Sequence, residues 1–390
     1  MKALDIIVVG GGMVGLSAAL MAARQGLQVA LVEAHAPKPW QKEQPDQRVV
    51  ALALDNQALI DSFGLWQDVL DRRAYPYSTM TVFDAVHSTP LRFDAGELGR
   101  PYLGHILEND ALVEVLWQAV IRESNILLYC PDKIGSLHET ESEVRIGLQS
   151  GVELSARLAI GADGASSRVR ELLGIATEDH DYGQKGLVAF VHTERTHEHT
   201  AWQCFLDSGP LAFLPFGEHC CSIVWSLSQT EADRLLKTEP EAFCQALDSA
   251  FAGKLGKTRL LSDRVAFPLR RRLAKTMIQG RTLLLGDAAH AVHPLAGQGV
   301  NLGLRDVSAL RDAFTASAGK TGDALDGAQL VRWARTRYSE NTVAALAFEN
   351  INRIFSNDNV ALSLLRGHLL GIGDRIVPLK NAMARYAAGL

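Results

Sequence analysis

A block of three glycines follows the first apolar segment of the chain and restricts the fold of the N-terminal region more than any other feature. Residues 4–9 predict a buried strand, residues 13–25 a helix with a small, apolar packing face, and residues 28–33 a second strand. The turn at 10–15 reads GGGMVG, which fits the pattern G-x-G-x-x-G. We therefore expect a right-handed strand–helix–strand unit at the start of the chain.

The turn has the properties of a dinucleotide-binding site. Gly10 permits the tight turn, Gly12 lets the backbone approach a pyrophosphate, and Gly15 lets helix and strand pack closely. The helix start offers unpaired N–H groups and a positive dipole end to the phosphates. Glu33 can accept hydrogen bonds from an adenosine ribose and disfavours the 2′-phosphate of NADP. The predicted binding residues are Gly10, Gly12, Met13, Val14, Gly15 and Glu33. A packing turn without a ligand is the alternative, and the motif does not separate NAD from FAD.

A second glycine-rich segment, GDAAHAVHPLAGQGVNLG at 286–303, ends another buried strand and favours FAD. Asp287 can bind a ribityl hydroxyl, which FAD has and NAD lacks. The small-residue loop at 294–299 lets a planar ring lie against backbone, and the helix starting at 299–301 can direct N–H groups at the flavin N1/O2 edge. The predicted contacts are Gly286, Asp287, Pro294, Gly297, Gln298, Gly299, Val300 and Asn301. No catalytic residue is assigned, and the flavin-loop candidates are His293, Pro294, Gly297 and Gln298. A helix start without a ligand is the alternative.

A third motif, GADG at 161–164, lies at a strand-to-helix junction. Asp163 and Gly164 are predicted to bind the cofactor. The aspartate would contact the pyrophosphate region through water, or organise the loop near a nicotinamide cofactor. An Asp-Gly turn without a ligand is the alternative.

Length and composition indicate several units in one reduced protein. The chain has 390 residues, which suggests two or three units. Its net charge of −5 gives no reason to expect nucleic acid. The five cysteines form no C-x-x-C pair, so a cytoplasmic setting is expected. The uncharged stretch 6–23 has the length of a membrane span, but its glycines favour the strand–turn–helix interpretation.

The hydrophobic pattern of the remaining sequence predicts that the nucleotide-binding strands are separated along the chain, with a strand-rich segment at 186–230 inserted between them. Further strands are expected at 125–129, 133–139, 143–148, 152–158, 158–162 and 282–286. Helices are expected at 108–122, 240–252, 299–316, 326–356 and 360–388.

The three motifs occur in the order found in flavoprotein aromatic hydroxylases of the p-hydroxybenzoate hydroxylase fold, which the chain resembles nearly end to end. It is most similar to the ubiquinone-biosynthesis hydroxylases (the UbiH/UbiF/VisC family). The segments carrying the resemblance are DQRVVAL (46–52), LGHILEN (103–109), IGADGASSRVR (160–170), AFLPF (212–216), CSIVWSLS (221–228) and GDAAHAVHPLAGQGVNLG (286–303). LWQDVLDRR (65–73), LGHILEN and CSIVWSLS resemble the VisC (UbiI) branch.

The resemblance implies a mixed α/β fold with a Rossmann-like FAD-binding domain, an inserted β-sheet substrate domain and C-terminal helices. The expected division is 1–70, 101–178 and 268–335 for the FAD-binding domain, 71–100 and 179–267 for the substrate domain, and 336–390 for the helical segment. Arg48 resembles the arginine that holds FAD, and Asp163 the aspartate of the motif shared by FAD and NADPH. Asp287 resembles the ribityl-binding aspartate, and the 294–299 loop resembles the wall of the isoalloxazine site.

The implied function is an FAD-dependent monooxygenase of ubiquinone biosynthesis that hydroxylates a 2-polyprenylphenol ring. NADPH or NADH would be the transient electron donor, and reduced flavin with O₂ would form a C4a-hydroperoxide that the phenol ring attacks. The cofactor carries this chemistry while the protein orients the ring. The implied partners are the prenylated phenol, O₂, a homo-oligomer or biosynthetic complex, and peripheral contact at the inner membrane surface through the segment 340–390.

Other interpretations remain open. The alternatives are another FAD oxidoreductase of this fold (a dehydrogenase, prenyl reductase or halogenase) and a non-catalytic flavin-binding scaffold. No metal is predicted from His290 and His293. Residues 197–199 (HEH) are expected in an exposed loop, and residues 270–272 (RRR) on a solvated charged face. The predicted substrate-pocket residues are Gln203, Phe205, Phe213 and Pro215, with core packing as the alternative for each.

Overall fold

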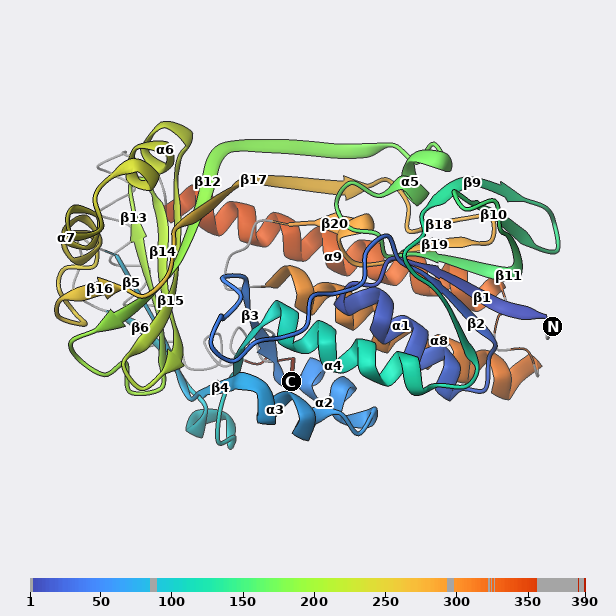
Figure 1. Ribbon diagram of the computed structural model, residues 1–390, viewed down its shortest axis with the longest axis horizontal. Coiled ribbons are helices and arrows are strands. Elements are labelled where there is room, and N and C mark those ends of the chain that lie inside the picture. The colour runs from blue at the N-terminus through green and yellow to red at the C-terminus, as the bar shows by residue number, and fades with distance from the viewer. Residues whose placement is uncertain are drawn as a thin grey trace.

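Three β-sheets organise the part of the chain that the structure describes, and the two larger ones lie at opposite ends of its long axis (Figure 1). The computed structural model describes residues 3–84, 90–292, 298–321, 323, 325, 327–355, 385 and 389–390. The eight-stranded sheet contains β18 (Ile278–Gln279), β19 (Thr282–Leu284), β11 (Glu153–Gly161), β1 (Leu4–Val9), β2 (Val29–Val32) and β8 (Ile126–Tyr129) in that order, with β10 (Val144–Leu148) and β9 (Ile134–Glu139) extending from β11.

The other two sheets come from segments between and around these strands. The nine-stranded sheet has the order β20 (His290–Ala291), β17 (Val265–Ala274), β12 (Thr177–Thr193), β15 (Cys220–Ser228), β14 (Gly209–Gly217), β13 (Thr200–Leu206), β5 (Thr79–Asp84) and β6 (Leu91–Asp94), with β16 (Thr258–Leu260) paired to β12. The three-stranded sheet has the order β3 (Val49–Ala53), β7 (Gly104–Glu108) and β4 (Ala74–Tyr77).

Helices cover the sheets and join them. They are α1 (Met13–Arg24), α2 (Leu54–Ser62), α3 (Trp66–Arg73), α4 (Asn109–Arg122), α5 (Arg168–Leu172), α6 (Gln229–Lys237), α7 (Pro240–Ala250), α8 (Gln298–Thr321) and α9 (Gly327–Phe355), with 3₁₀ turns at Gly96–Leu98 and Gly286–Ala288. The long strands β12 and β17 of the nine-stranded sheet run side by side toward the eight-stranded sheet, and α9 lies beneath them in the view of Figure 1. No helix among the described residues is both long enough and apolar enough to span a bilayer.

Register in the eight-stranded sheet brings the three sequence motifs together. The parallel strands β8, β2, β1, β11 and β19 align Tyr129, Val32, Val9, Gly161 and Leu284 in one row. The glycine turn, Glu33, the GADG segment and the Gly-Asp segment all follow this row directly in sequence. Ligands of open parallel sheets bind outside the carboxyl ends of the strands, so this edge is the expected cofactor site.

The strand prediction for 152–162 needs one correction. The two expected strands are one, β11, whose burial changes from alternating to continuous along its length. Its first half pairs antiparallel with β10, where one face is exposed, and its second half lies between β1 and β19, where both faces are covered. The helix α6 was not predicted, although Ser228 caps it by accepting from the Glu231 N–H at 3.2 Å. The expected helix at 360–388 lies almost wholly outside the described residues.

The nine-stranded sheet has two different faces, because successive side chains of a strand point to opposite sides. One face packs against α6 and α7 through an outer cluster that includes Phe213, Cys221 and Phe251. The other face meets the three-stranded sheet. We call this contact the inner cluster, and it consists of Ala51, Ile106, Phe190, Ala201, Leu214 and Phe216 with the partly buried Val49, Tyr77, Met80, Ala212, Cys220 and Val224.

Candidate active site

Close backbone packing explains the glycines of the first motif. Gly10 has φ +110°, and a Cβ there would collide with the main chain at Ala162. A Cβ on Gly15 would overlap the Gly10 carbonyl oxygen. A Cβ on Gly12 would meet nothing within 4 Å, so space for a ligand lies beside the backbone at this position. This geometry matches the roles predicted for the three residues.

A groove of about 480 Å³ lies at this edge of the sheet, and its lining joins two of the motifs. Its walls include Gly10–Gly12, Glu33, Lys133 and Asp163. The Gly11 N–H donates to Glu33 Oε2, and the His35 N–H donates to Oε1 at 2.9 Å, so the carboxylate fixes the turn against β2. The groove therefore contains an acid at the position expected for a ribose partner and open backbone at the position expected for phosphates.

Asp163 combines a structural role with a vacant hydrogen-bonding position. Its Oδ2 accepts from the N–H groups of Arg168 (2.7 Å) and Val169 (3.0 Å), at the start of α5. Its Oδ1 is buried without a hydrogen-bond partner among the described residues. Gly164 has φ +79°, as the Asp-Gly turn requires. The turn and the binding interpretations are thus compatible, because a buried, unpaired carboxylate oxygen at the groove suits a donor from a ligand or water.

Arg170 links the third motif to the second. Its guanidinium donates to the carbonyl oxygens of Ala288 (2.7 Å) and Ala165 (2.8 Å), and only 7% of the residue is exposed. Burial lowers the pKa of this group, and the nearby charge of Arg272 acts in the same direction. The arginine therefore fixes the distance between the GADG loop and the Gly-Asp turn, which lie more than a hundred residues apart in the chain.

The Gly-Asp turn packs against the glycine turn as well. Gly286 has φ +58°, and a Cβ there would lie 3.1 Å from Val14 Cγ2. A Cβ on Gly303 would meet the same Val14 methyl at 2.6 Å. The side chain of Val14 thus fills the space between the end of β19 and the start of α8. Its side chain is a packing element, and the predicted cofactor contact of this residue would involve its backbone.

Asp287 follows Gly286 and has an exposed side chain. The surrounding protein raises the pKa of its carboxyl by desolvation, while His290 acts in the opposite direction. Gln298 begins α8, so the N–H groups of Gln298, Gly299 and Val300 precede the first hydrogen bond of the helix. His293, Pro294 and Gly297, together with the side chain of Gln298, lie outside the described residues, and their predicted roles stay predictions.

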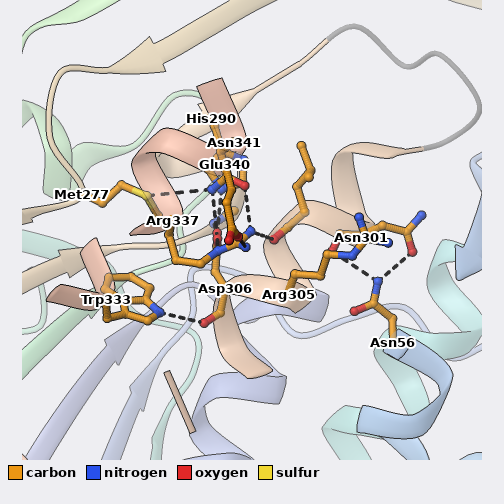
Figure 2. Close-up of polar contacts among 12 residues, drawn as sticks. Asn56, Met277, His290, Asn301, Arg305, Asp306, Trp333, Arg337, Glu340 and Asn341 are labelled. Atoms are coloured by element: carbon orange, nitrogen blue, oxygen red, sulfur yellow. Dashed lines mark hydrogen bonds and ion pairs between the residues drawn. The ribbon is translucent and has the colours of Figure 1, made fainter. Parts of the chain in front are cut away.

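A buried network around Asp306 holds this turn in place, and sequence reasoning missed it (Figure 2). Asp306 Oδ2 accepts from His290 Nε2 at 2.6 Å and from the Gly286 N–H at 3.1 Å. Its Oδ1 accepts from Arg337 Nε at 2.8 Å and from Asn341 Nδ2 at 3.0 Å. Burial alone would raise the pKa of the fully buried Asp306 carboxyl, but these partners outweigh it and the pKa is lowered. The carboxylate joins the turn to α8 and α9.

Asn301 joins the start of α8 to β3 (Figure 2). Its Nδ2 donates to the Ala51 carbonyl oxygen at 2.8 Å, and its Oδ1 accepts from the Ala53 N–H at 3.0 Å and from Asn56 Nδ2 at 2.8 Å. The side chain is 1% exposed and committed to these contacts. The side chain of Asn301 therefore fixes the helix start against β3, and the predicted cofactor contact of this residue stays a prediction.

Arg48 lies just before β3 and outside the groove lining. Its side chain is 65% exposed, with Nη2 3.4 Å from Asp110 Oδ1 and Nε 3.6 Å from Asp46 Oδ1. Exposed ion pairs of this length contribute little stability, so the guanidinium can exchange these partners for a ligand. Its FAD-holding role stays a prediction.

The four predicted substrate-pocket residues lie on two different faces of the nine-stranded sheet, and for two of them the position favours the core-packing alternative. Phe213 is fully buried in the outer cluster, with its ring centroid 4.2 Å from that of Phe251. Pro215 pairs with Cys221, which belongs to the same cluster. Gln203 pairs with Ala212 of the inner cluster, and Phe205 packs on Val82 and Leu91. Phe213 and Pro215 are therefore core residues, while Gln203 and Phe205 remain candidates.

The two minor predictions hold only in part. Residues 197–199 lie in a loop between β12 and β13 where Glu198 and His199 are exposed, as predicted, but His197 is only 1% exposed because its ring contacts the Gly217 carbonyl oxygen and the His199 N–H. The three arginines at 270–272 pair with acids of β12 at 3.0, 2.8 and 2.7 Å, and the side chain of Arg271 is buried. Among the described residues, no group of three His, Cys, Asp or Glu side chains is placed to hold a metal ion.

The geometry predicts that Asp287→Ala weakens FAD binding by roughly 10–100-fold, because the loss of one charge-assisted hydrogen bond reduces affinity by about this factor. The exposed side chain carries little of the fold, so the melting temperature of the apoprotein should stay unchanged. Fluorescence titration of apoprotein with FAD measures the affinity. Asp312→Ala removes an exposed acid from α8 and is the matched control. Equal affinities of the two variants would contradict the ribityl assignment.

A sheet edge that brings two glycine turns and an acid together has the architecture of a dinucleotide-binding site. Comparison with known proteins agrees, since residues 3–332 match the family model described as "FAD binding domain". The chain is 34% identical to the 3-demethoxyubiquinol 3-hydroxylase of Escherichia coli K12, over 99% of this chain and 98% of that protein. It is 33% identical to the ubiquinone hydroxylase UbiL of Rhodospirillum rubrum, over 100% and 90%. The chain belongs to the family of FAD-dependent ubiquinone-biosynthesis hydroxylases.

Solved structures establish the fold. The p-nitrophenol 4-monooxygenase PnpA of Pseudomonas putida DLL-E4 superposes with a TM-score of 0.78 at 18% identity, over 98% of this chain and 97% of that one. The predicted mixed α/β fold of the p-hydroxybenzoate hydroxylase type is confirmed. The protein is an FAD-dependent monooxygenase, and NAD(P)H as electron donor is typical of its family.

Proposed function

We propose that this monooxygenase hydroxylates the ring of a prenylated phenol in ubiquinone biosynthesis. The observation that carries the proposal is the inner cluster. It is apolar and faces the three-stranded sheet. The main-chain carbonyl oxygen of its Ala51 accepts a hydrogen bond from the side chain of Asn301 at the start of α8. A helix start suits negative charge on the reduced pyrimidine edge of a flavin. The reacting ring would therefore lie beside apolar side chains that suit an aromatic substrate.

The residues of the chain have separate tasks in this reaction. When bound, FAD supplies the redox chemistry with NAD(P)H and O₂. The glycine turn and Glu33 would hold its adenosine end, while Asp287 and the first turn of α8 would hold its flavin end. The inner cluster would orient the substrate ring and keep water away. None of these tasks needs a nucleophilic side chain.

We propose 2-polyprenylphenol hydroxylation as the particular step, on the basis of the segments at 65–73, 103–109 and 221–228. A second candidate is hydroxylation of a later, quinol-type intermediate, because the Escherichia coli relative is named for 3-demethoxyubiquinol. Disruption of the gene separates the two. The first predicts accumulation of a prenylated phenol whose only oxygen on the ring is its hydroxyl, and the second predicts accumulation of the demethoxy quinone. Unaltered ubiquinone with no accumulated precursor would contradict both.

We also propose that the enzyme meets its substrate at the inner membrane surface, alone or within a biosynthetic complex. A long prenyl tail keeps such a substrate in lipid. The exposed Val343 (67%) and Leu346 (43%) of α9 support contact with an apolar partner. Replacing both by glutamate should reduce flotation of the protein with vesicles of phosphatidylethanolamine and phosphatidylglycerol. Unchanged flotation would count against this surface.

A further inference from the structure

Tyr77 is a partly buried member of the inner cluster whose hydroxyl group has no hydrogen-bond partner among the described residues. It ends β4, and its ring packs among the apolar residues of that cluster. Among the described residues, no hydrogen bond is made by its Oη. Burial raises the pKa of this phenol to about 12, and no neighbouring charge or hydrogen bond contributes. The hydroxyl therefore stays protonated at neutral pH and has both its donor and its acceptor positions vacant.

Gly104 gives the ring of Tyr77 its direction. The three-stranded sheet aligns Tyr77, Gly104 and Ala53 in one row, with β7 in the middle. A Cβ on Gly104 would lie 3.1 Å from both Cε1 and Oη of Tyr77, and 2.5 Å from the Leu52 carbonyl oxygen. The phenol therefore extends across β7 toward β3, over the position where any other residue would place a side chain.

The same row ends at the first turn of α8. The Ala53 N–H donates to Asn301 Oδ1 at 3.0 Å, and Asn301 also binds Asn56 (Figure 2). The start of α8 thus lies at the outer edge of β3, and Tyr77 reaches toward β3 from the opposite edge of the small sheet. A substrate ring held in the inner cluster would lie between the Tyr77 hydroxyl and the N–H groups expected to face the flavin.

We propose that Tyr77 Oη hydrogen-bonds the phenolic oxygen of the substrate and so fixes which ring carbon faces the flavin. The inference rests on the proposed function. A phenol that enters an apolar cluster loses its hydration, and an unpaired buried hydroxyl costs about 1–3 kcal/mol. The vacant Tyr77 hydroxyl offsets that cost. With its high pKa the tyrosine orients the substrate and does not act as its base.

The experiment compares Tyr77→Phe with Tyr75→Phe, which alters another half-buried tyrosine of the same strand. Two probes are titrated into each FAD-loaded variant: 2-prenylphenol with one isoprene unit, and prenylbenzene, which lacks the hydroxyl. Flavin absorbance reports the dissociation constants. Tyr77→Phe should weaken 2-prenylphenol binding about three- to tenfold, as expected for the loss of one neutral hydrogen bond. The binding of prenylbenzene should stay unchanged. Product analysis should show hydroxylation at more than one ring carbon. Tyr75→Phe should alter neither probe.

Each other outcome counts against the inference. Equal losses for both probes would show that Tyr77 only supports packing, and no loss would show that the phenol does not meet it. This inference alone would be overturned if the wild-type protein hydroxylates 2-prenylphenol and Tyr77→Phe still prefers 2-prenylphenol over prenylbenzene and hydroxylates the same ring carbon. Wild-type protein that binds FAD but neither binds nor hydroxylates 2-prenylphenol would overturn the proposed function together with it.

Discussion

Asp306→Ala is expected to lower the free energy of unfolding by about 3–5 kcal/mol, the cost of removing one member of a buried ion pair. The substitution leaves Arg337 and His290 buried without the acceptor they share, and it frees the Gly286 N–H. The free energy of unfolding of a typical domain is only about 5–15 kcal/mol, so this loss is large. Urea denaturation of apoprotein measures it. A loss below about 1 kcal/mol would contradict the central place of Asp306 in the fold.

Asp306→Asn keeps the shape of the side chain and serves if the alanine variant does not fold. The amide retains one acceptor oxygen but places a donor against Arg337 or His290. We expect a loss of about 1–3 kcal/mol, with weaker FAD binding because the Gly-Asp turn loosens. Glu340→Gln is the matched control, since it alters an exposed carboxylate bound to the same Arg337. The control should change the free energy of unfolding by less than about 1 kcal/mol.

The effect of Asp306 should depend on pH in a defined direction. Its folded-state pKa lies below the ordinary value, so its contribution to stability is complete above the pKa of the unfolded chain. That contribution is lost as the pH falls through the lowered, folded-state pKa. Denaturation at a series of acidic pH values should therefore bring wild type and Asp306→Ala closer together. A difference that stays constant or widens on acidification would contradict the lowered pKa.

Gly15→Ala is the second substitution with a large expected effect. The added methyl group would overlap the Gly10 carbonyl oxygen, which belongs to main chain that cannot rotate away. Moving the glycine turn by the distance needed costs about 1–3 kcal/mol. It also withdraws the backbone from the pyrophosphate site, so we expect roughly 100-fold weaker FAD binding. Gly319→Ala is the control, because a Cβ at this helical position meets nothing within 4 Å. FAD affinity of Gly15→Ala within about twofold of the control would refute the assigned role.

The cofactor edge was predictable because its parts are local. Each motif is a short glycine or acid pattern directly after a buried strand, and parallel strands bring their carboxyl ends together whatever lies between them. The long ribbon of β12 and β17 was not predictable in this way. Its strands pair residues about ninety positions apart, and its charged pairs carry no alternation that distinguishes a strand from a loop.

The sequence contains only a weak signal for the network around Asp306. Asp306 lies between the buried Leu302 and Leu310 at intervals of four residues, so an acid on the apolar stripe of α8 was the available signal. Its partner Arg337 lies on α9, and only the packing of the two helices brings them together. The placement of Phe213 and Pro215 on the outer face was not predictable for a different reason. A one-residue shift moves every side chain of a strand to its other face, and hydrophobicity did not distinguish two apolar faces.

Titration of folded apoprotein with FAD, followed by ultrafiltration and absorbance, tests most directly whether the separated motifs hold a single flavin nucleotide. The structure predicts saturation at one FAD per chain, with protection of the apoprotein against thermal unfolding that grows with FAD concentration. Folded protein that retains no flavin at any FAD concentration, or that gains no thermal protection, would contradict this account of the site.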